Sequence, residues 1–403
     1  MMLHHSLNGA KLLLLGLLVG CQPGTFDIAG TSGNGNRVSQ QQALPKNPAL
    51  SQNVNGEKIG SGPIRVALLV PATAAGGGGV AGKQIANAAR LAMQDFGANR
   101  FQLVIKDTKG QASTAQSKTS EALQEGASLV LGPLFSGNVS SASAVSEPSK
   151  KPMIAFSSDT NRARAGVYLL SFAPQDDVAR TINFGISRGS NRIVALLPQS
   201  AYGNLVEREL RRVATQSGAN VTAIARYKQE ANSIIEAARS VALQVNESNA
   251  IFIPQGGKIP TLVIKTLKQS GVQFNGQQIM GSGQWESVDI KEPALEGAIF
   301  AGAEKSNFAQ FSNRYQTKYG AVPTMTAALG YDAVSLAAEL VRRKTIQPFS
   351  PAAIQSSAGF TGVTGLFRFK ANGRLQRGLV INQIQGGQRI IASPAPRSFG
   401  PNS

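Results

Sequence analysis

Cysteine and histidine are almost absent from this chain of 403 residues. It has one cysteine, Cys21, and two histidines, His4 and His5. Beyond position 21 there is therefore no thiol to form a disulfide or act as a nucleophile, and no imidazole for base catalysis or metal binding. The candidate serines also lack the G-x-S-x-G surroundings of a hydrolase nucleophile. We therefore predict that the protein is not an enzyme and has no catalytic residues, no bound metal and no cofactor.

Charged residues are also few, at 15% of the chain, and acidic residues are fewer than basic ones. Forty Lys and Arg against 22 Asp and Glu give a formal net charge of +18. The basic residues are spread out without interleaved aromatics, which argues against a nucleic-acid partner. Two interpretations stay open, a solvated basic surface or attraction to anionic partners in the cell envelope. With 42% apolar residues the chain can bury a large core, and its length indicates two domains or lobes.

The apolar run near the N-terminus is too short to span a membrane. It extends from Leu12 to Val19 behind Lys11, which fits the central region of an export signal. It ends in Leu18-Val19-Gly20-Cys21, which resembles the lipobox of bacterial lipoproteins, whose cysteine is lipidated. We therefore predict a lipoprotein signal peptide at residues 1–20 and lipidation of Cys21; the alternative is an ordinary signal peptide with an incidental cysteine. Because Gln22 rather than Asp follows, the resemblance implies the periplasmic face of the cell envelope, with the outer membrane favoured.

Residues 21–63 are rich in Gly, Ser, Asn and Gln and have almost no apolar periodicity. Such a segment buries too little surface to offset the entropy of ordering it. We predict a disordered tether there, and a flexible coil of this length has a root-mean-square reach of about 35 Å.

Apolar strands and amphipathic helices then alternate along residues 64–172. Buried strands are expected at 64–70, 101–105, 129–131, 153–156 and 167–172, with helices between them. Three consecutive strand–helix units favour a doubly wound α/β lobe. The glycines at 76–79 are expected to form a flexible loop at the mouth of a cleft, because Gln84 stands where a phosphate-binding loop needs Ser or Thr.

The same pattern restarts at residue 173 and continues to 302, which predicts a second lobe of similar size. Helices at 308–319 and 324–343 are expected to return to the first lobe, as part of a segment at about 303–378. A hairpin-like pair of strands is expected at 365–369 and 379–384. The segment at about 379–393 is assigned to the second lobe, and residues 394–403 to a flexible tail. The predicted fold class is α/β, with two Rossmann-like lobes, each with a parallel sheet, joined by crossovers around a cleft.

Hydroxyl side chains follow two neighbouring strands of the first lobe. Ser136 lies in the polar loop after the strand at 129–131, and Ser157 and Ser158 directly follow the strand at 153–156. Ligands of parallel sheets bind beyond the carboxyl ends of the strands. We therefore predict that these serines form half of a binding cleft for a small polar molecule. The alternatives are that Ser136 caps its helix and that the other two serines are turn residues.

Several short motifs, in their order and spacing, resemble type I periplasmic binding proteins of the leucine/isoleucine/valine-binding kind over roughly residues 64–390. Details near positions 70, 107, 132 and 156 look more like one branch of that family, lipoproteins regarded as activators of penicillin-binding proteins. The motifs are Gly132-Pro133-Leu-Phe-Ser136, Pro152-Met-Ile-Ala-Phe-Ser157-Ser158-Asp159, Ala201-Tyr202-Gly203, Gly330-Tyr331-Asp332-Ala333 and Gly362-Val-Thr-Gly365.

The resemblance implies a cleft between two lobes that closes on a ligand like a hinge. Ser136 matches the hydroxyl that meets the ligand carboxylate, and Ser157 or Ser158 the position that meets its carboxylate and ammonium. Tyr202 matches an aromatic residue that lines the cleft from the second lobe. The acidic partner of the ammonium falls near Gln284-Trp285-Glu286, where Trp285 is either a wall of the cleft or part of the core.

Two functions of different class follow. The first, which we expect, is a lipid-anchored periplasmic solute-binding protein that takes an amino acid or a related small ligand to an ABC-type permease. The alternative is an outer-membrane lipoprotein that uses the same fold as a scaffold to activate a penicillin-binding protein, a peptidoglycan synthase. The hydroxyl loops favour the first function, and the lipid anchor and long tether favour the second.

Overall fold

The computed structural model describes residues 50–399. The predicted signal peptide, the lipidation site at Cys21 and most of the predicted tether lie outside the described residues. Within residues 50–399, no helix has the length and apolar character needed to cross a membrane.

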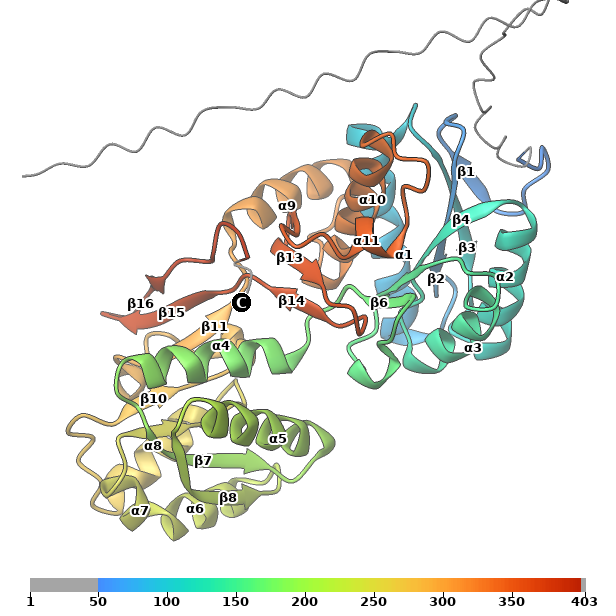
Figure 1. Ribbon diagram of the computed structural model, residues 1–403. Helices are drawn as coiled ribbons and strands as arrows, with labels where there is room; N and C mark the ends of the chain where they lie inside the picture. The colour runs from blue at the N-terminus through green and yellow to red at the C-terminus, as the bar shows by residue number, and fades with distance from the viewer. Residues whose placement is uncertain (1–49, 400–403) are drawn as a thin grey trace, which may run out of the picture. The chain divides into compact units, whose positions relative to one another are not determined.

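The first sheet has six strands in the order β1-β3-β2-β4-β5-β6 (Figure 1). Strands β2 to β6 pair in parallel, and β1 is an antiparallel edge strand beside β3. Every residue of β2 is buried, as expected for a strand covered on both faces. The strands are β1 Glu57–Ile59, β2 Arg65–Val70, β3 Gln102–Asp107, β4 Ala127–Leu131, β5 Met153–Ala155 and β6 Val167–Leu169.

Helices cover both faces of this sheet (Figure 1). Val66, Leu68 and Val70 pack with α1, α9 and α10, whereas Ala67 and Leu69 face α2 and α3. The helices α9 and α10 thus return to the first sheet after the chain has built the second. These helices are α1 Gly76–Ala92, continued by the π-helical turn η1 Met93–Gly97, α2 Ala112–Gln124, α3 Ser136–Ser146, α9 Ser306–Tyr319, α10 Met325–Arg342 and α11 Pro351–Ile354.

The expected glycine loop at 76–79 is wrong, because these residues form the first turn of α1. Close approach to the preceding backbone explains the small residues better than flexibility does. A Cβ on Gly79 would lie 2.1 Å from the carbonyl oxygen of Ala74, and one on Gly82 would lie 2.6 Å from the carbonyl carbon of Pro71. The glycines therefore let α1 start directly against the end of β2.

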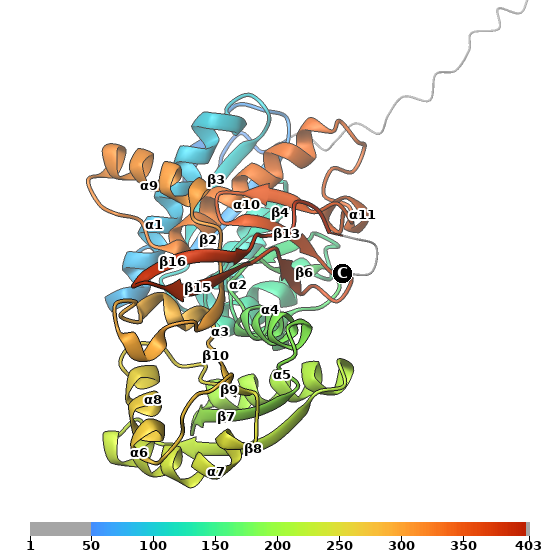
Figure 2. The same cartoon turned by 90° about the vertical axis from the view of Figure 1, so that its left-hand side faces the viewer.

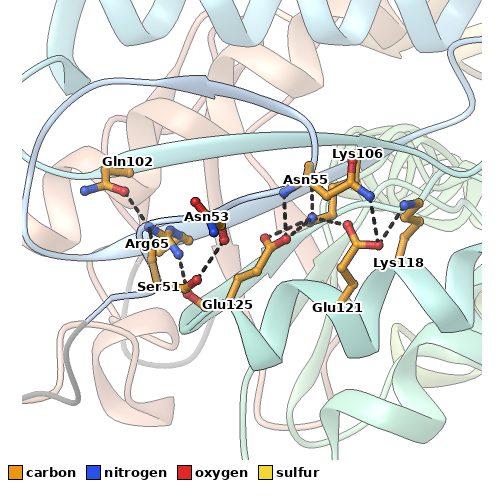
Figure 3. A network of polar contacts seen from close by, with 9 residues as sticks. All are labelled: Ser51, Asn53, Asn55, Arg65, Gln102, Lys106, Lys118, Glu121 and Glu125. Carbon is orange, nitrogen blue, oxygen red and sulfur yellow. Dashed lines mark hydrogen bonds and ion pairs between the residues drawn. The ribbon is translucent and has the colours of Figure 1, made fainter.

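The prediction of disorder is also wrong for the end of the tether, since Glu57–Ile59 forms β1 and pairs with β3. Buried cations hold this polar segment (Figure 3). Arg65 donates to the carbonyl oxygen of Ser51 at 2.9 Å, and Lys106 donates to that of Asn55. Lys106 is 2% exposed and also pairs with the carboxylates of Glu121 in α2 and of Glu125 just after it. Hydrogen bonds to buried cations thus fix the residues before β1, while β1 itself pairs with β3 and packs Ile59 against the core.

The second sheet has seven strands in the order β16-β15-β11-β10-β9-β7-β8. Strands β7 to β11 pair in parallel, and β15 and β16 add antiparallel strands at one edge. Helices α4 and α5 pack on one face and α6 and α8 on the other (Figure 2). The strands are β7 Arg192–Pro198, β8 Asn220–Tyr227, β9 Ala250–Phe252, β10 Gln278–Met280, β11 Ile299–Gly302, β15 Val380–Gln385 and β16 Gln388–Ser393. The helices are α4 Pro174–Ser187, α5 Ala201–Gln216, α6 Ala231–Ser240, α7 Ala242–Asn246 and α8 Ile259–Gln269.

The predicted pairing of 365–369 with 379–384 is wrong. Strand β13 (Gly365–Phe369) pairs with β12 (Phe360–Gly362) and with β14 (Leu375–Arg377) in a small separate sheet. The chain then leaves this sheet, and β15 pairs with β11. The second strand was misplaced because the apolar run at 379–384 packs into the cores of the second lobe.

The chain passes between the two sheets three times, after β6, after β11 and after β14. Both sheets are mainly parallel and carry helices on both faces. This confirms the predicted fold class of two Rossmann-like α/β lobes joined by crossovers.

Candidate functional site

The carboxyl ends of β2 to β5 lie at one edge of the first sheet, because these strands are parallel neighbours. Polar side chains after β3 and β5 bond to neighbouring loops. The carboxylate of Asp107 accepts hydrogen bonds from the Thr73 hydroxyl and, at 2.9 Å, from the Lys109 N–H. Burial opposes ionisation, but these hydrogen bonds hold the pKa of Asp107 below its ordinary value.

Ser136 belongs to a three-residue cluster at the start of α3. Its Oγ donates to Oδ2 of Asp159 at 2.6 Å and accepts from Nε of Arg162 at 2.9 Å. The hydrogen bond from Ser136 is the largest cause that lowers the pKa of Asp159, and Arg162 adds to it. The alternative that Ser136 caps its helix is wrong, because Ser136 is the first residue of α3 and no side chain caps the helix. The side chains that could meet a ligand are therefore already bonded to one another.

Ser157 and Ser158 differ in exposure. Ser157 is 4% exposed, and its Oγ accepts a hydrogen bond from the Asp159 N–H at 3.2 Å, which is the turn role left open by the sequence. Ser158 is exposed at the same edge of the sheet. Ligand contact by either serine stays a prediction.

Phe135 is a candidate site residue that the sequence analysis did not single out. Its side chain is 37% exposed. It lies over two glycines: a Cβ on Gly78 would be 2.7 Å from its Cζ, and one on Gly110 would be 3.2 Å from its Cε2. The aromatic ring thus covers the first turn of α1 and the loop after β3. A glycine in each of these two segments is the sequence signal that a bulky neighbour lies close.

Tyr202 lies at the carboxyl edge of the second sheet, in the first turn of α5. Its hydroxyl lies 3.0 Å from Oγ of Ser282, which itself donates to the carbonyl oxygen of Pro254 at 2.6 Å. Burial raises the pKa of Tyr202 to about 12, so the phenol stays protonated. The loops after β7, β9 and β10 are joined in this way.

Two acidic residues in the first turn of α4 were also missed. Burial raises the pKa of Asp176 to about 7, and burial and then the neighbouring Asp176 raise the pKa of Asp177 to about 8. Asp177 lies against Gly283, where a Cβ would be 2.2 Å from its Oδ2. Oδ2 of Asp176 is buried without a hydrogen-bond partner in residues 50–399. The sequence signal was a pair of acidic residues after Pro174 at a helix start.

A hydrogen bond connects this helix start to the first lobe. Nε2 of Gln175 donates to Oγ1 of Thr160 at 3.1 Å. Thr160 directly follows Asp159. The polar groups after β5 and those at the start of α4 are therefore neighbours.

A family model described as periplasmic binding protein matches residues 63–388. The chain belongs to the periplasmic binding protein family. This confirms the resemblance on which the fold was predicted. No match was found among curated proteins.

Solved structures with this fold include three transport proteins. A putative branched-chain amino acid ABC transporter from Rhodospirillum rubrum is 19% identical, with a TM-score of 0.68 over 81% of this chain and 99% of that one. A substrate-binding protein from Desulfitobacterium hafniense in complex with Leu is 18% identical, with a TM-score of 0.57 over 82% and 100%. A solute-binding protein from Rhodopseudomonas palustris in complex with 3,4-dihydroxybenzoic acid is 16% identical, with a TM-score of 0.56 over 84% and 99%. At these identities the likeness concerns the fold.

The sequence left two positions open for Trp285, a wall of the cleft or the core. In this periplasmic binding protein it lies in the core. Its side chain is fully buried, and its indole N–H donates to the carbonyl oxygen of Ile253 at 2.7 Å. Its ring lies 6.1 Å from that of Phe300. The neighbouring Glu286 forms ion pairs with Lys305 and Arg389.

Two cavities in the described residues lie away from the predicted site residues. One of about 350 Å³ lies between α10 and β12, and its lining includes Arg100, Glu339 and Phe360. The other, of about 420 Å³, includes Arg188, Asn249 and Gln278. Neither contains any of the five predicted ligand-binding residues, Ser136, Ser157, Ser158, Tyr202 and Trp285.

Proposed function

We propose that the protein is a periplasmic solute-binding protein that holds a small polar ligand between its lobes and delivers it to an ABC-type permease. The lobes comprise residues 64–172 with 303–378, and residues 173–302 with 379–393. The observation that carries the proposal is the Gln175–Thr160 hydrogen bond. This bond joins the residue after Asp159, which is itself bonded to Ser136, to the first turn of α4, where two acidic residues lie.

An amino acid or a related compound is the proposed ligand class. The solved structures with this fold include one with leucine and one with a dihydroxybenzoic acid. Tyr202, Ser282 and Asp177 supply polar atoms on the second lobe, and Ser157 and Ser158 supply them on the first. Few precisely placed polar groups are what a small-molecule site uses for orientation.

Native mass spectrometry of protein purified without denaturation tests the function, because a tight ligand travels with the protein. Calorimetry with amino acids and hydroxybenzoates then measures affinity. Tyr202→Phe is expected to weaken binding about tenfold by removing one hydrogen bond, which is worth about 1.4 kcal/mol at that ratio. Tyr319→Phe is the matched control, since its hydroxyl is buried without a partner in the described part of the chain. A ligand-free protein that gives no heat with any compound would defeat the proposal.

Attachment to the outer membrane through Cys21 is the proposed anchor, after removal of residues 1–20. Support comes from the lipobox-like sequence and from the position of the only cysteine. Mass spectrometry of the mature N-terminus measures the lipid directly. Cys21→Ser is expected to release the protein from the membrane fraction, and an unchanged distribution would contradict the anchor.

Activation of a peptidoglycan synthase is the second candidate function. It is favoured by the mutual bonding of Ser136, Asp159 and Arg162, which leaves the first-lobe hydroxyl satisfied without a ligand. The test is polymerisation by a purified penicillin-binding protein with and without this protein. Stimulation by a chain that binds no solute would favour this function over transport.

A further inference from the structure

The cavity of about 350 Å³ on the first lobe combines apolar walls with charged side chains. It lies between η1, α10 and the strands β12 and β13. Its apolar lining consists mainly of Phe96, Leu336, Phe360 and Phe367. Small-molecule sites have volumes of about 300 to 1,000 Å³, so this cavity has room for a small ligand with an apolar body.

Phe96 is held in the wall of this cavity although it is 41% exposed. It belongs to the π-helical turn η1, and its ring packs edge to face on that of Tyr331, 5.9 Å away. The preceding Asp95 accepts from the Tyr331 hydroxyl at 2.6 Å and from Nη2 of Arg314 at 2.6 Å. Short π-helical turns are rare and occur frequently at functional sites. These contacts fix an exposed aromatic ring before any ligand binds, which lowers the cost of binding.

Arg100 brings a cation without an acidic partner to the same cavity. Its Nη1 donates to a carbonyl oxygen of α10 at 3.5 Å, and it forms no ion pair within residues 50–399. The guanidinium of Arg343 lies 5.4 Å from the ring centre of Phe360 and pairs with Glu339 at 3.2 Å. Because Glu339 also pairs with Arg342, the only exposed carboxylate of the lining is already shared by two cations.

Asp332 is the other acidic residue of the lining, and it does not offset the charge of Arg100. It is 1% exposed and accepts from the N–H groups of Val363 at 2.7 Å and Thr364 at 3.2 Å. Its charge interacts with the buried guanidinium of Arg377, which lowers its pKa against the larger effect of burial. The charge left for a ligand in this cavity is therefore positive.

We propose that this cavity is a second ligand site, for a small amphipathic carboxylate with a ring or short chain as its body. The body lies against Phe96 and Phe360. The carboxylate pairs with Arg100, since a guanidinium binds a carboxylate through two parallel hydrogen bonds and one unpaired cation matches one negative charge.

The second site lies apart from the proposed site between the lobes. Arg100 stands two residues before β3, at the amino edge of the parallel strands, whereas Ser136 follows β4 at their carboxyl edge. The inference therefore does not depend on the proposed solute-binding function.

Calorimetry of the purified protein with phenylacetate and with the uncharged phenylacetamide tests the proposal. We expect saturable binding, with the carboxylate bound about tenfold more tightly than the amide. Arg100→Met is expected to remove this preference, and Phe96→Ala is expected to weaken the binding of both compounds. The matched control is Arg208→Met, which should keep the preference. Arg208 is an exposed arginine of α5 that forms no ion pair in the described part of the chain and lies outside both cavities.

Equal affinity of the wild type for the two compounds would overturn the proposal, as would saturable binding of neither. A preference that persists in Arg100→Met would also overturn it. So would an equal loss in Arg208→Met, because the net charge of +18 would then select the anion. Should Arg100→Met not fold, Arg100→Lys keeps the charge without the paired hydrogen bonds and is expected to reduce the preference about threefold. An unchanged preference in Arg100→Lys would equally refute the pairing.

Tyr202→Phe distinguishes the two sites. It is expected to bind phenylacetate as tightly as the wild type does, because Tyr202 lies on the second lobe and is not part of this cavity. A loss in Tyr202→Phe would place the probe between the lobes, which would refute the second site and leave the proposed function standing.

Discussion

The two lobes bring acidic residues to the candidate site in opposite electrostatic states. On the first lobe, hydrogen bonds from side chains and backbone hold the pKa of Asp107 and of Asp159 below the ordinary value. On the second lobe, burial raises the pKa of Asp176 to about 7 and of Asp177 to about 8. At neutral pH the first-lobe carboxylates are charged, whereas Asp177 is largely protonated.

The difference follows from hydrogen bonding on the first lobe and from burial on the second. Loops after parallel strands leave N–H groups and hydroxyls free to meet a carboxylate, as the turn at Lys109 does for Asp107. Asp176 and Asp177 lie in the first turn of α4, where a helix start favours a carboxylate, but burial outweighs this effect and raises both pKa values. A carboxyl that keeps its proton can also donate a hydrogen bond. The acidic residues of the second lobe can therefore both donate and accept hydrogen bonds, whereas those of the first lobe are acceptors with a fixed negative charge.

Removing Arg377 should have the largest effect on this contrast. Its guanidinium is buried, donates to the carbonyl oxygen of Ser171 at 2.8 Å and to Oγ1 of Thr364 at 2.9 Å, and its charge lowers the pKa of Asp176 and Asp177. Arg377→Met should destabilise the protein by about 3 to 5 kcal/mol, because it leaves the buried Asp332 without its cation and the carbonyl oxygen of Ser171 without its donor. Chemical denaturation measures the free energy of unfolding.

The matched control is Arg374→Met, three residues earlier on the same hairpin and exposed. Such a surface change should stay within about 0.5 kcal/mol. An equal loss of stability in the two variants would contradict the role of Arg377 as a buried counter-ion.

Asp177→Asn should stabilise the protein at neutral and higher pH. Because the folded pKa is raised from 3.8 to about 8, the contribution of Asp177 is complete below pH 3.8 and is lost as the pH rises through 8. The loss is at most about 1.4 kcal/mol per pH unit, and Asp176 takes up part of it, so we expect the variant to gain roughly 2 kcal/mol between pH 5 and pH 8. Melting temperatures of both proteins across this range measure the gain. A parallel pH dependence of wild type and variant would contradict the raised pKa.

Much of the fold could be predicted because buried parallel strands appear as continuous apolar runs. Strand β2 is such a run, and so is β7. Strand β1 could not be predicted this way, since two of its three residues are charged and exposed, and the residues before it are held by Lys106 and Arg65 from elsewhere in the chain. The pairing of β13 with β14 was missed because the turn at Gly373 indicates a hairpin but does not show which residues form its second strand.

The edge of the sheet at which Ser136 and Ser157 lie could be predicted from the sequence, but the contacts of their side chains could not. Topology places Ser136 and Ser157 at the carboxyl edge of the sheet, and that much follows from the order of strands. That Ser136 is bonded to Asp159 and Arg162 depends on the path of the loop after β5, which no local pattern specifies. Trp285 lies between polar residues in the sequence, yet tertiary packing places it in the core.

Asp159→Asn should have a smaller effect and the opposite pH dependence. The lowered pKa means that its contribution is present above the unfolded pKa and is lost as the pH falls through the folded pKa. At pH 7 we expect a destabilisation of about 1 kcal/mol, since the pair with Arg162 is partly exposed. Denaturation at pH 7 and pH 3 measures it, and the difference from wild type should shrink at pH 3. A difference that grows as the pH falls would mean that the pKa of Asp159 is raised, like those of Asp176 and Asp177, and would contradict this prediction.

Thr73→Val should have the smallest effect on stability, about 0.5 kcal/mol, because its hydrogen bond to Asp107 lies on the exposed rim of the sheet. The informative quantity is the pKa of Asp107, which NMR titration of its carboxyl carbon reports. The pKa should rise toward the ordinary value but stop short of it, since the Lys109 N–H still donates. An unchanged pKa would mean that backbone donors alone keep this carboxylate ionised. The low pKa of Asp107 would then follow from the backbone geometry of its loop and not from the Thr73 hydroxyl.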